Sequence, residues 1–309
     1  MIDIAIIGCG IAGLTAGIYG ARGGMETVLF EELLPGGQSV NILNLENYPG
    51  FPNGIVGSQL LLDTMEQMQN AGASLRYDGL KELKLGKNGS PHTLMFGENR
   101  EQARTVIIAT GANPRKLGVE RERELTGRGI SYCAACDGAL YRDKTVAVVG
   151  GGDTSLTDSL VLANFVKKVY LIHRRDEFRG SLVLQQRVQN EPKIEIKLQN
   201  KVAALLGEDK LEAVLLHDIV TDLERELTVD ALFVAVGVSP HTEFLEGILK
   251  LSSTGQIITD ERMATSAPGV FAAGDCRQTP LRQVITAAAD GAVAASTAIE
   301  YILEQKSWA

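Results

Sequence analysis

The sequence predicts an α/β protein with two three-layer, Rossmann-like domains, the second inserted into the first. Three observations lead to this expectation. One pattern of strand, glycine turn, helix and strand occurs twice, starting at Ile4 and again at Val146. Each copy opens with a continuous apolar run, which is typical of a strand buried on both faces of a parallel sheet. The 309 residues also suffice for two domains of ordinary size.

The first copy begins with an apolar strand at 4–7, which enters the turn Gly8-Cys9-Gly10-Ile11-Ala12-Gly13. A helix is expected over about 11–24 and a second strand over 27–31. This order of strand, turn, helix and strand is a βαβ unit.

The glycines of this first turn predict a dinucleotide site. Gly8 permits the tight bend, Gly10 lets a pyrophosphate approach the backbone, and Gly13 lets helix and strand pack closely. The helix N-terminus then faces the phosphates with unpaired N–H groups. Glu31 ends the second strand, where an acid accepts a hydrogen bond from a ribose hydroxyl. The alternative is a glycine turn that serves only packing.

The second copy repeats this unit. An apolar strand at 146–149 enters the turn Gly150-Gly151-Gly152-Asp153-Thr154-Ser155, followed by a helix over about 153–165 and a strand over 168–173.

The second site differs from the first at the end of its second strand. The chain there carries no acid but basic side chains. An acid would repel a 2′-phosphate, whereas guanidinium groups pair with one. We therefore expect NADP(H) rather than NAD(H); the alternative is a solvated basic turn. The residues expected at this site are Gly150, Gly152, Asp153, Thr154, Ser155, His173, Arg174, Arg175 and Arg179.

Further strands extend the repeat and suggest the domain order. One ends in Ala109-Thr110-Gly111, and its counterpart in the second unit ends at Gly237. A third, at 270–273, leads through Gly274-Asp275 into an Ala-rich helix over about 282–303. Since each unit closes at its own strand and glycine, this last piece returns to the first unit. The expected domains are 1–114 with 242–309, and 115–241.

A Cys133-Ala134-Ala135-Cys136 pair lies just upstream of the second turn. Such a pair is ambiguous between zinc binding, redox chemistry and an inert role. Zinc is disfavoured because Cys9, Cys276 and the four histidines show no ligand spacing, so we expect no metal site. A nicotinamide donates hydride, a flavin accepts it, and a dithiol can receive the electrons, which places FAD in the first unit. Asp137 could carry a proton for the dithiol, or only cap the turn that follows it.

Composition excludes several other classes of protein. A net charge of −8 argues against a nucleic-acid or anionic-membrane partner. The apolar runs are far shorter than the roughly 20 residues that span a bilayer. The chain starts directly in strand-like sequence, so we expect no signal peptide and a cytoplasmic protein.

Taken together, the motifs resemble those of the low-molecular-weight thioredoxin reductases along nearly the whole chain. The matching segments are Gly8–Gly13, Pro35–Gln38, Glu46–Phe51, Ala109–Ala112, Ser131–Gly138, Gly150–Thr154, His173–Arg175 with Phe178-Arg179, Gly274-Asp275 and Arg282-Gln283. Each segment alone is modest evidence, whereas all of them in this order are very specific.

The resemblance implies roles for these residues. Cys136 would lie next to the flavin, Cys133 would attack the disulfide of thioredoxin, and Asp137 would act as the acid and base. The resemblance also implies a homodimer in which the NADPH domain swivels. The FAD contacts that it implies are the first glycine turn, Gly36, Gly37, Gln38, Asn47, Thr110, Gly111, Gly274, Asp275, Arg282, Gln283 and Val284, and the NADPH phosphate contacts are Arg174, Arg175 and Arg179.

Two departures from the family pattern leave further functions open. Ala135 stands where the family usually has threonine, and Thr157-Asp158-Ser159 stands where it usually has two glutamates and an alanine. Relatives with altered NADPH domains take electrons from ferredoxin or another donor. The chain could also be a dithiol oxidase that passes electrons to O₂, or a flavin-based redox sensor.

Overall fold

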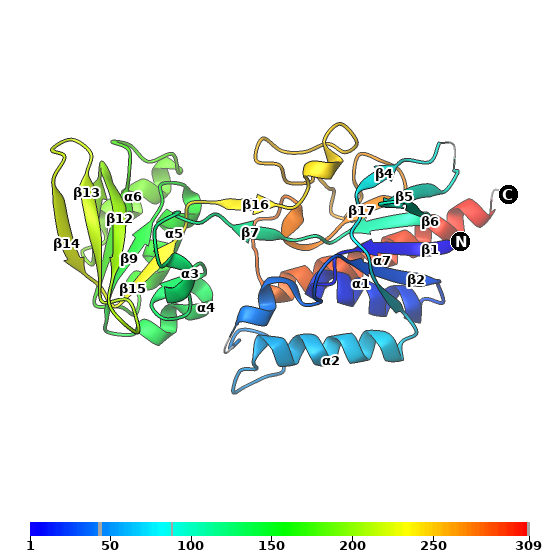
Figure 1. The fold of residues 1–309 in the computed structure, drawn as a ribbon, viewed down its shortest axis with the longest axis horizontal. Helices are drawn as coiled ribbons and strands as arrows, with labels where there is room; N and C mark the ends of the chain where they lie inside the picture. Colours follow the sequence, from blue (N-terminus) through cyan, green and yellow to red (C-terminus); the bar gives the residue numbers. More distant parts are fainter. Residues whose placement is uncertain (43–44, 88, 308–309) are drawn as a thin grey trace. The chain divides into compact units, whose positions relative to one another are not determined.

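The computed structural model describes residues 1–42, 45–87 and 89–307. The chain forms two compact units, the first made of Met1–Asn113 with Ser239–Ala309 and the second of Pro114–Val238. The sequence predicts these changes of unit after residues 114 and 241. The predicted fold class, two Rossmann-like α/β units with one inserted into the other, is confirmed (Figure 1).

The first unit is built on a 7-stranded sheet with a parallel centre. Its parallel strands are, in spatial order, β3 (Ser74–Tyr77), β2 (Thr27–Glu31), β1 (Ile2–Ile7), β6 (Asn99–Ile108) and β17 (Val270–Ala272). β5 (His92–Phe96) and β4 (Glu82–Lys84) continue antiparallel from the start of β6. The last strand of the chain, β17, therefore returns to the first unit beside β6.

Three helices of the first unit pack together on one face of this sheet. α1 (Ile11–Arg22) contacts both α2 (Gly57–Asn70) and α7 (Val284–Ser307) (Figure 1). A Cβ placed on Gly291 would lie 2.1 Å from the carbonyl oxygen of Ala12, so α1 and α7 approach backbone to backbone. Short 3-10 turns complete the unit: η1 (Gly37–Asn41), η3 (Glu243–Leu245) and η4 (Gly274–Cys276).

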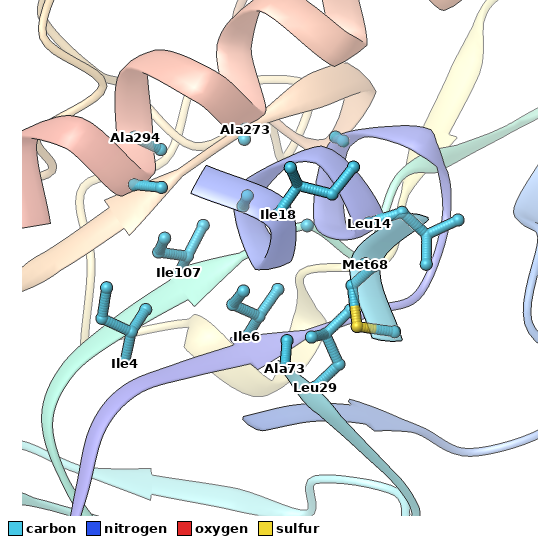
Figure 2. Close-up of a cluster of buried hydrophobic side chains, with 14 of the residues drawn as sticks. Ile4, Ile6, Leu14, Ile18, Leu29, Met68, Ala73, Ile107, Ala273 and Ala294 are labelled. Carbon is cyan, nitrogen blue, oxygen red and sulfur yellow. The ribbon is translucent and has the colours of Figure 1, made fainter. Parts of the chain in front are cut away.

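Alternation along β1 assigns its side chains to two cores. Ile4 and Ile6 are fully buried with Leu14 of α1 and Met68 of α2 (Figure 2). Ala5 and Ile7 point to the other face, where they pack with side chains of β4 and β5. Both faces of the strand are thus buried, which explains the continuous apolar run.

The second unit follows the same plan. Its 5-stranded parallel sheet has the order β11 (Ile194–Leu198), β10 (Lys168–His173), β9 (Thr145–Val149), β15 (Ala231–Val234) and β8 (Ile130–Ser131). An antiparallel meander follows, made of β12 (Asn200–Leu206), β13 (Ala213–Asp218) and β14 (Glu224–Thr228). The helices are α3 (Glu122–Leu125), α4 (Ala134–Asp137), α5 (Asp153–Ala163) and α6 (Leu182–Asn190), with the 3-10 turn η2 (Gly138–Tyr141).

Strand β9 shows the two faces of this second sheet. Val146 and Val148 pack with residues of α5, whereas Ala147 and Val149 pack with residues of the β12–β13 meander. One face of this second sheet is therefore covered by helices and the other by the antiparallel meander. Where the chain passes between the units, β7 (Ala112–Pro114) pairs with β16 (Val238–Pro240).

Most predicted elements match the observed ones within three residues, and the differences have simple causes. β6 starts at Asn99, earlier than its apolar part, because its first half is an antiparallel partner of β5 with polar side chains exposed. The helix predicted from 282 starts at Val284, because Gln283 donates its N–H to the side chain of Thr286. In the part of the chain that the structure describes, no helix is long and apolar enough to span a bilayer.

Candidate nucleotide and redox sites

In the first glycine turn, each glycine meets a different constraint. Gly8 has a φ of 105°, and a Cβ there would lie 2.4 Å from the carbonyl oxygen of Ala109. A Cβ on Gly13 would lie 2.0 Å from the carbonyl oxygen of Gly8. A Cβ on Gly10 would meet nothing within 4 Å, so this backbone faces open space. The turn thus presents a bare backbone at the start of α1, as a bound pyrophosphate requires.

The Glu31 side chain is tied to this turn. Its carboxylate accepts hydrogen bonds from the N–H of Cys9 at 2.9 Å and from the N–H of Leu33 at 3.2 Å. Burial, with a smaller effect of Glu31, raises the pKa of the Cys9 thiol to about 12. Cys9 therefore stays protonated and inert, as expected of a small buried residue.

The loop after β2 lies against the same turn. The N–H of Gly36 donates to the carbonyl oxygen of Cys9 at 2.9 Å. A Cβ on Gly37 would lie 3.5 Å from the Cα of Gly10, and both loop glycines have positive φ, 130° and 58°. The Gln38 amide then donates to the carbonyl oxygen of Ala112 and, at 3.1 Å, to the Asn113 side chain.

The Gly274-Asp275 turn follows β17 beside the starts of two helices. A Cβ on Gly274 would lie 3.0 Å from the Cβ of Ala12 in α1 and 3.7 Å from that of Ala287 in α7. Burial raises the pKa of Asp275 to about 6, and Arg282 opposes this rise. The Nε atom of Arg282 is buried and has no hydrogen-bond partner. An unpaired buried donor of this kind fits a site for an oxygen-rich ligand.

The remaining predicted residues of this site are held by side-chain hydrogen bonds or by backbone conformation. Asn47 donates its amide to the side-chain oxygen of Gln283 at 3.0 Å, just before Val284 opens α7. The Thr110 hydroxyl donates to the carbonyl oxygen of His241 at 2.7 Å, and Gly111 has a φ of 68°.

Most of these residues lie where parallel strands end. Gly8, Glu31, Thr110 and Gly274 follow or end β1, β2, β6 and β17, respectively. Ligands of open α/β sheets bind at this carboxyl edge. His241 and Thr286 also hold the site together, but no pattern in the sequence pointed to either residue.

The second glycine turn repeats the first with one substitution. A Cβ on Gly150 would lie 2.4 Å from the carbonyl oxygen of Ala235, and one on Gly152 would meet nothing within 4 Å. Ser155 takes the place of the third glycine; it is buried, and its hydroxyl donates to the carbonyl oxygen of Gly152 at 2.8 Å. The exposed Thr154 precedes it in the first turn of α5, and Asp153 accepts a hydrogen bond from the N–H of Ser181 at 2.7 Å.

His173 lies beneath this turn rather than beside the arginines at the surface. A Cβ on Gly151 would lie 2.1 Å from a ring carbon of His173, and the ring Nε2 is 3.1 Å from the carbonyl oxygen of Glu177. Burial lowers its pKa, and the nearby arginines lower it further. The neutral ring thus supports the shape of the turn from below.

The three arginines form a cationic group next to the turn. Arg174, Arg175 and Arg179 are exposed, and each is close enough to His173 to lower its pKa. The N–H of Arg179 donates to the carbonyl oxygen of Gly151 at 2.7 Å, which fixes the loop to the turn. No ion pair within the described ranges involves any of the three. Their charge is therefore available to an anion.

Cys133 and Cys136 form a disulfide at the start of the short helix α4. Their Cα atoms are 5.3 Å apart, and the N–H of Cys136 donates to the Cys133 sulfur at 3.2 Å. Both residues are partly exposed, whereas Cys9 and Cys276 are buried. Of the four cysteines, Cys133 and Cys136 are therefore the two that a partner protein can reach.

Asp137 ends α4 with its side chain turned to the preceding strand. Its carboxylate accepts a hydrogen bond from the Ser131 hydroxyl at 2.7 Å. It makes no capping hydrogen bond to η2, so the capping role left open from the sequence is not what its side chain does. Sequence reasoning missed Ser131, because only the geometry of the turn brings it to Asp137.

The residue before Cys133 is held by a buried carboxylate. Glu122 accepts hydrogen bonds from the N–H groups of Leu117 and Gly118 and from the Tyr132 hydroxyl, each at 2.9 Å. Burial, with Glu122, raises the pKa of Tyr132 to about 12. Glu122 therefore joins the segment that enters the second unit to the redox turn.

Glu122→Ala is expected to lower the free energy of unfolding by about 3 kcal/mol, because three donors lose a buried acceptor. Urea unfolding followed by circular dichroism measures the change. Glu124→Ala is the matched control, since Glu124 lies on the same helix but is exposed and pairs with Arg121. Equal losses in both variants would contradict a special role for Glu122.

Thr157-Asp158-Ser159 departs from the family pattern of two glutamates and an alanine, and the structure shows a role for Ser159. Ser159 is fully buried and donates to the carbonyl oxygen of Ser155 at 2.7 Å, while Thr157 is exposed. Burial raises the pKa of Asp158 to about 6.

Within residues 1–42, 45–87 and 89–307, no group of three or more His, Cys, Asp or Glu side chains could hold a metal ion.

Comparison with known proteins agrees with the motifs. The family model described as pyridine nucleotide-disulphide oxidoreductase matches residues 2–291. The thioredoxin reductase of Treponema pallidum (strain Nichols) is 42% identical over 300 residues, covering 97% of this chain and 97% of that protein. The thioredoxin reductase of Listeria innocua is 40% identical over 305 residues, covering 98% and 95%. The crystal structure of thioredoxin reductase from Streptococcus pyogenes MGAS5005 has a TM-score of 0.91 at 38% identity, covering 98% and 99%. The resemblance inferred from the motifs is confirmed.

Proposed function

Since the chain belongs to the pyridine nucleotide-disulphide oxidoreductase family, we propose that it is a thioredoxin-disulfide reductase. Electrons pass from NADPH through FAD to the Cys133–Cys136 disulfide and on to thioredoxin. The observation that carries this proposal is the disulfide itself, which lies on the same unit as a glycine turn lined by arginines. Relatives named thioredoxin reductase, about 40% identical along nearly the whole chain, support it.

Family membership gives the chain a flavin and a pyridine nucleotide as cofactors. The assignment of FAD to the first unit is our proposal, and three features support it. The Gly10 backbone is open, Glu31 ends β2 beside the turn, and the buried Nε of Arg282 lacks a partner. NADPH is assigned to the second unit because the exposed arginines beside Gly152 fit a 2′-phosphate.

A flavin held by the first unit would supply the chemistry that links a two-electron hydride donor to the disulfide. The residues of the chain then carry out the exchange. The Cys133 sulfur attacks the disulfide of thioredoxin and forms a mixed disulfide, and its proton passes to the thioredoxin sulfur that this attack releases. The Cys136 thiolate attacks Cys133, releases thioredoxin as a dithiol and restores the internal disulfide. Asp137 takes the proton from Cys136 and returns it to the leaving sulfur.

Both the cysteine pair and the nicotinamide would need access to one flavin. Since both lie on the second unit, we propose that this unit rotates relative to the first within a homodimer in the cytoplasm. The paired crossings β7 and β16 are where the chain would turn.

Anaerobic titration of the purified flavoprotein with NADPH, NADH and reduced ferredoxin tests this function. NADPH is expected to reduce the protein with two hydride equivalents per chain, one for the flavin and one for the disulfide. NADH is expected to act only at much higher concentration, and thioredoxin is expected to reoxidise the product. Reduction by ferredoxin alone would favour a relative with another donor. Reoxidation by O₂ but not by thioredoxin would favour a dithiol oxidase, and a failure to turn over would favour a redox sensor.

A further inference from the structure

Ser131 occupies a fixed position beside the redox turn. It ends β8, where it pairs with Phe233 of β15, and it is 5% exposed. The preceding Ile130 is 1% exposed in the core of the second unit. The strand and the core therefore set the place of the Ser131 hydroxyl before any substrate arrives.

This hydroxyl contacts both chemical parts of the turn. It donates to the Asp137 carboxylate at 2.7 Å and accepts the N–H of Cys133 at 3.1 Å. The carbonyl oxygen of Cys133 is 3.3 Å away, but a hydroxyl has one proton, and the shorter contact is to the carboxylate. Ser131 thus links the backbone of one redox cysteine to the acid beside the other.

The Asp137 carboxylate has little else to orient it. Among the residues that the structure describes, Ser131 is the one side chain that donates a hydrogen bond to it, and no ion pair holds it. A partly exposed aspartate without such a partner would sample several rotamers, whereas a charge-assisted hydrogen bond of 2.7 Å selects one.

We propose that Ser131 is a positioning residue that holds Asp137 for proton transfer during the exchange with thioredoxin. This inference rests on the proposed function. In that exchange the dithiol gives two electrons and two protons to the disulfide of thioredoxin. One of these protons leaves the Cys136 thiol as its sulfur attacks Cys133, and it ends on the sulfur of thioredoxin that departs. Asp137 carries this proton, so its orientation affects the rate of this exchange step. It does not affect the rate of the earlier reduction of the flavin by NADPH.

The test compares Ser131→Ala, Ser131→Thr, Asp137→Asn and the double variant Ser131→Ala/Asp137→Asn. In Ser131→Ala, the kcat for thioredoxin reduction is expected to fall about 10-fold while the KM for thioredoxin stays within about twofold. Stopped-flow reduction of the flavin by NADPH is expected to keep its wild-type rate. Ser131→Thr, which keeps the hydroxyl, is expected to restore most of the kcat.

The double variant shows whether Ser131 acts through Asp137. If it does, the double variant is no slower than Asp137→Asn alone, because the serine then has nothing to orient. Losses that multiply would overturn the inference, as would an unchanged kcat in Ser131→Ala. If the wild-type protein fails to reduce thioredoxin, the proposed function falls; the same variants assayed with a small aromatic disulfide then still decide the role of Ser131.

Discussion

Cys136→Ser is expected to abolish both thioredoxin reduction and the flavin–thiolate charge-transfer absorbance, whereas Cys133→Ser is expected to abolish only the reduction. The reason is that each sulfur has a different neighbour in the proposed mechanism. With Cys133 replaced, Cys136 remains as a thiolate beside the flavin and gives the absorbance. With Cys136 replaced, the remaining sulfur is the one that faces the partner. Either change removes the disulfide that accepts the electron pair.

Visible spectra of the purified variants and an assay of NADPH oxidation with thioredoxin measure these effects. Loss of turnover is expected to exceed about 10³-fold, because no alternative cysteine can replace the missing sulfur. Cys9 and Cys276 are buried, and burial raises the pKa of Cys276 to about 11. Ala135→Ser is the matched control, since it places a serine at an exposed position of the same turn and keeps both sulfurs.

Two outcomes would contradict this division of roles. Charge-transfer absorbance in Cys136→Ser but not in Cys133→Ser would mean that the two sulfurs have exchanged roles. Thioredoxin reduction by both single variants would mean that the disulfide is not part of the electron path.

The sequence predicted the two glycine turns because strand, turn and helix follow one another directly along the chain, although the contact that requires the first glycine comes from a distant strand. Gly8 and Gly150 each stand where a Cβ would meet the carbonyl oxygen at the end of a neighbouring strand. Gly10 and Gly152 each face open space. These requirements follow from the order of strand, turn and helix, and that order is visible in the apolar runs.

The antiparallel strands were not predicted because their patterns are weak. β4 has three residues, of which only Leu83 is buried, and β14 has no fully buried residue. The first half of β6 is polar because β5, and not a second core layer, pairs with it. Such strands depend on neighbours that lie far along the chain, which periodicity within a short window does not report.

The side-chain contacts within the candidate sites were also not predicted from the sequence. His173 adjoins the arginines in sequence, yet its ring is buried against Gly151. Ser131 lies six residues before Asp137 and reaches it because α4 turns the chain back. Glu122 lies ten residues before Tyr132 and accepts the hydrogen bond of its hydroxyl. In each case the residue type was compatible with several roles, and only the path of the backbone selects one.

The double variant Arg174→Ala/Arg175→Ala is expected to raise the KM for NADPH by at least about 100-fold and to leave the KM for NADH nearly unchanged. Each guanidinium lost removes a charge-assisted contact to the 2′-phosphate, worth about 1.5–3 kcal/mol. NADH lacks that phosphate, so its binding does not depend on these side chains. Loss of nicotinamide absorbance, measured with thioredoxin in excess, gives both constants.

Arg225→Ala is the matched control for this change, because Arg225 is an exposed arginine on β14 of the same unit. Its removal alters the net charge of the unit without touching the glycine turn, so both KM values are expected to stay near wild type. Parallel rises in the two constants upon removal of Arg174 and Arg175 would show that the arginines support the fold of the turn. Equal catalytic efficiency of the wild-type protein with NADPH and NADH would remove the basis for assigning a 2′-phosphate to this site. The KM rises for NADPH and not for NADH only if the guanidinium groups of Arg174 and Arg175 bind the 2′-phosphate.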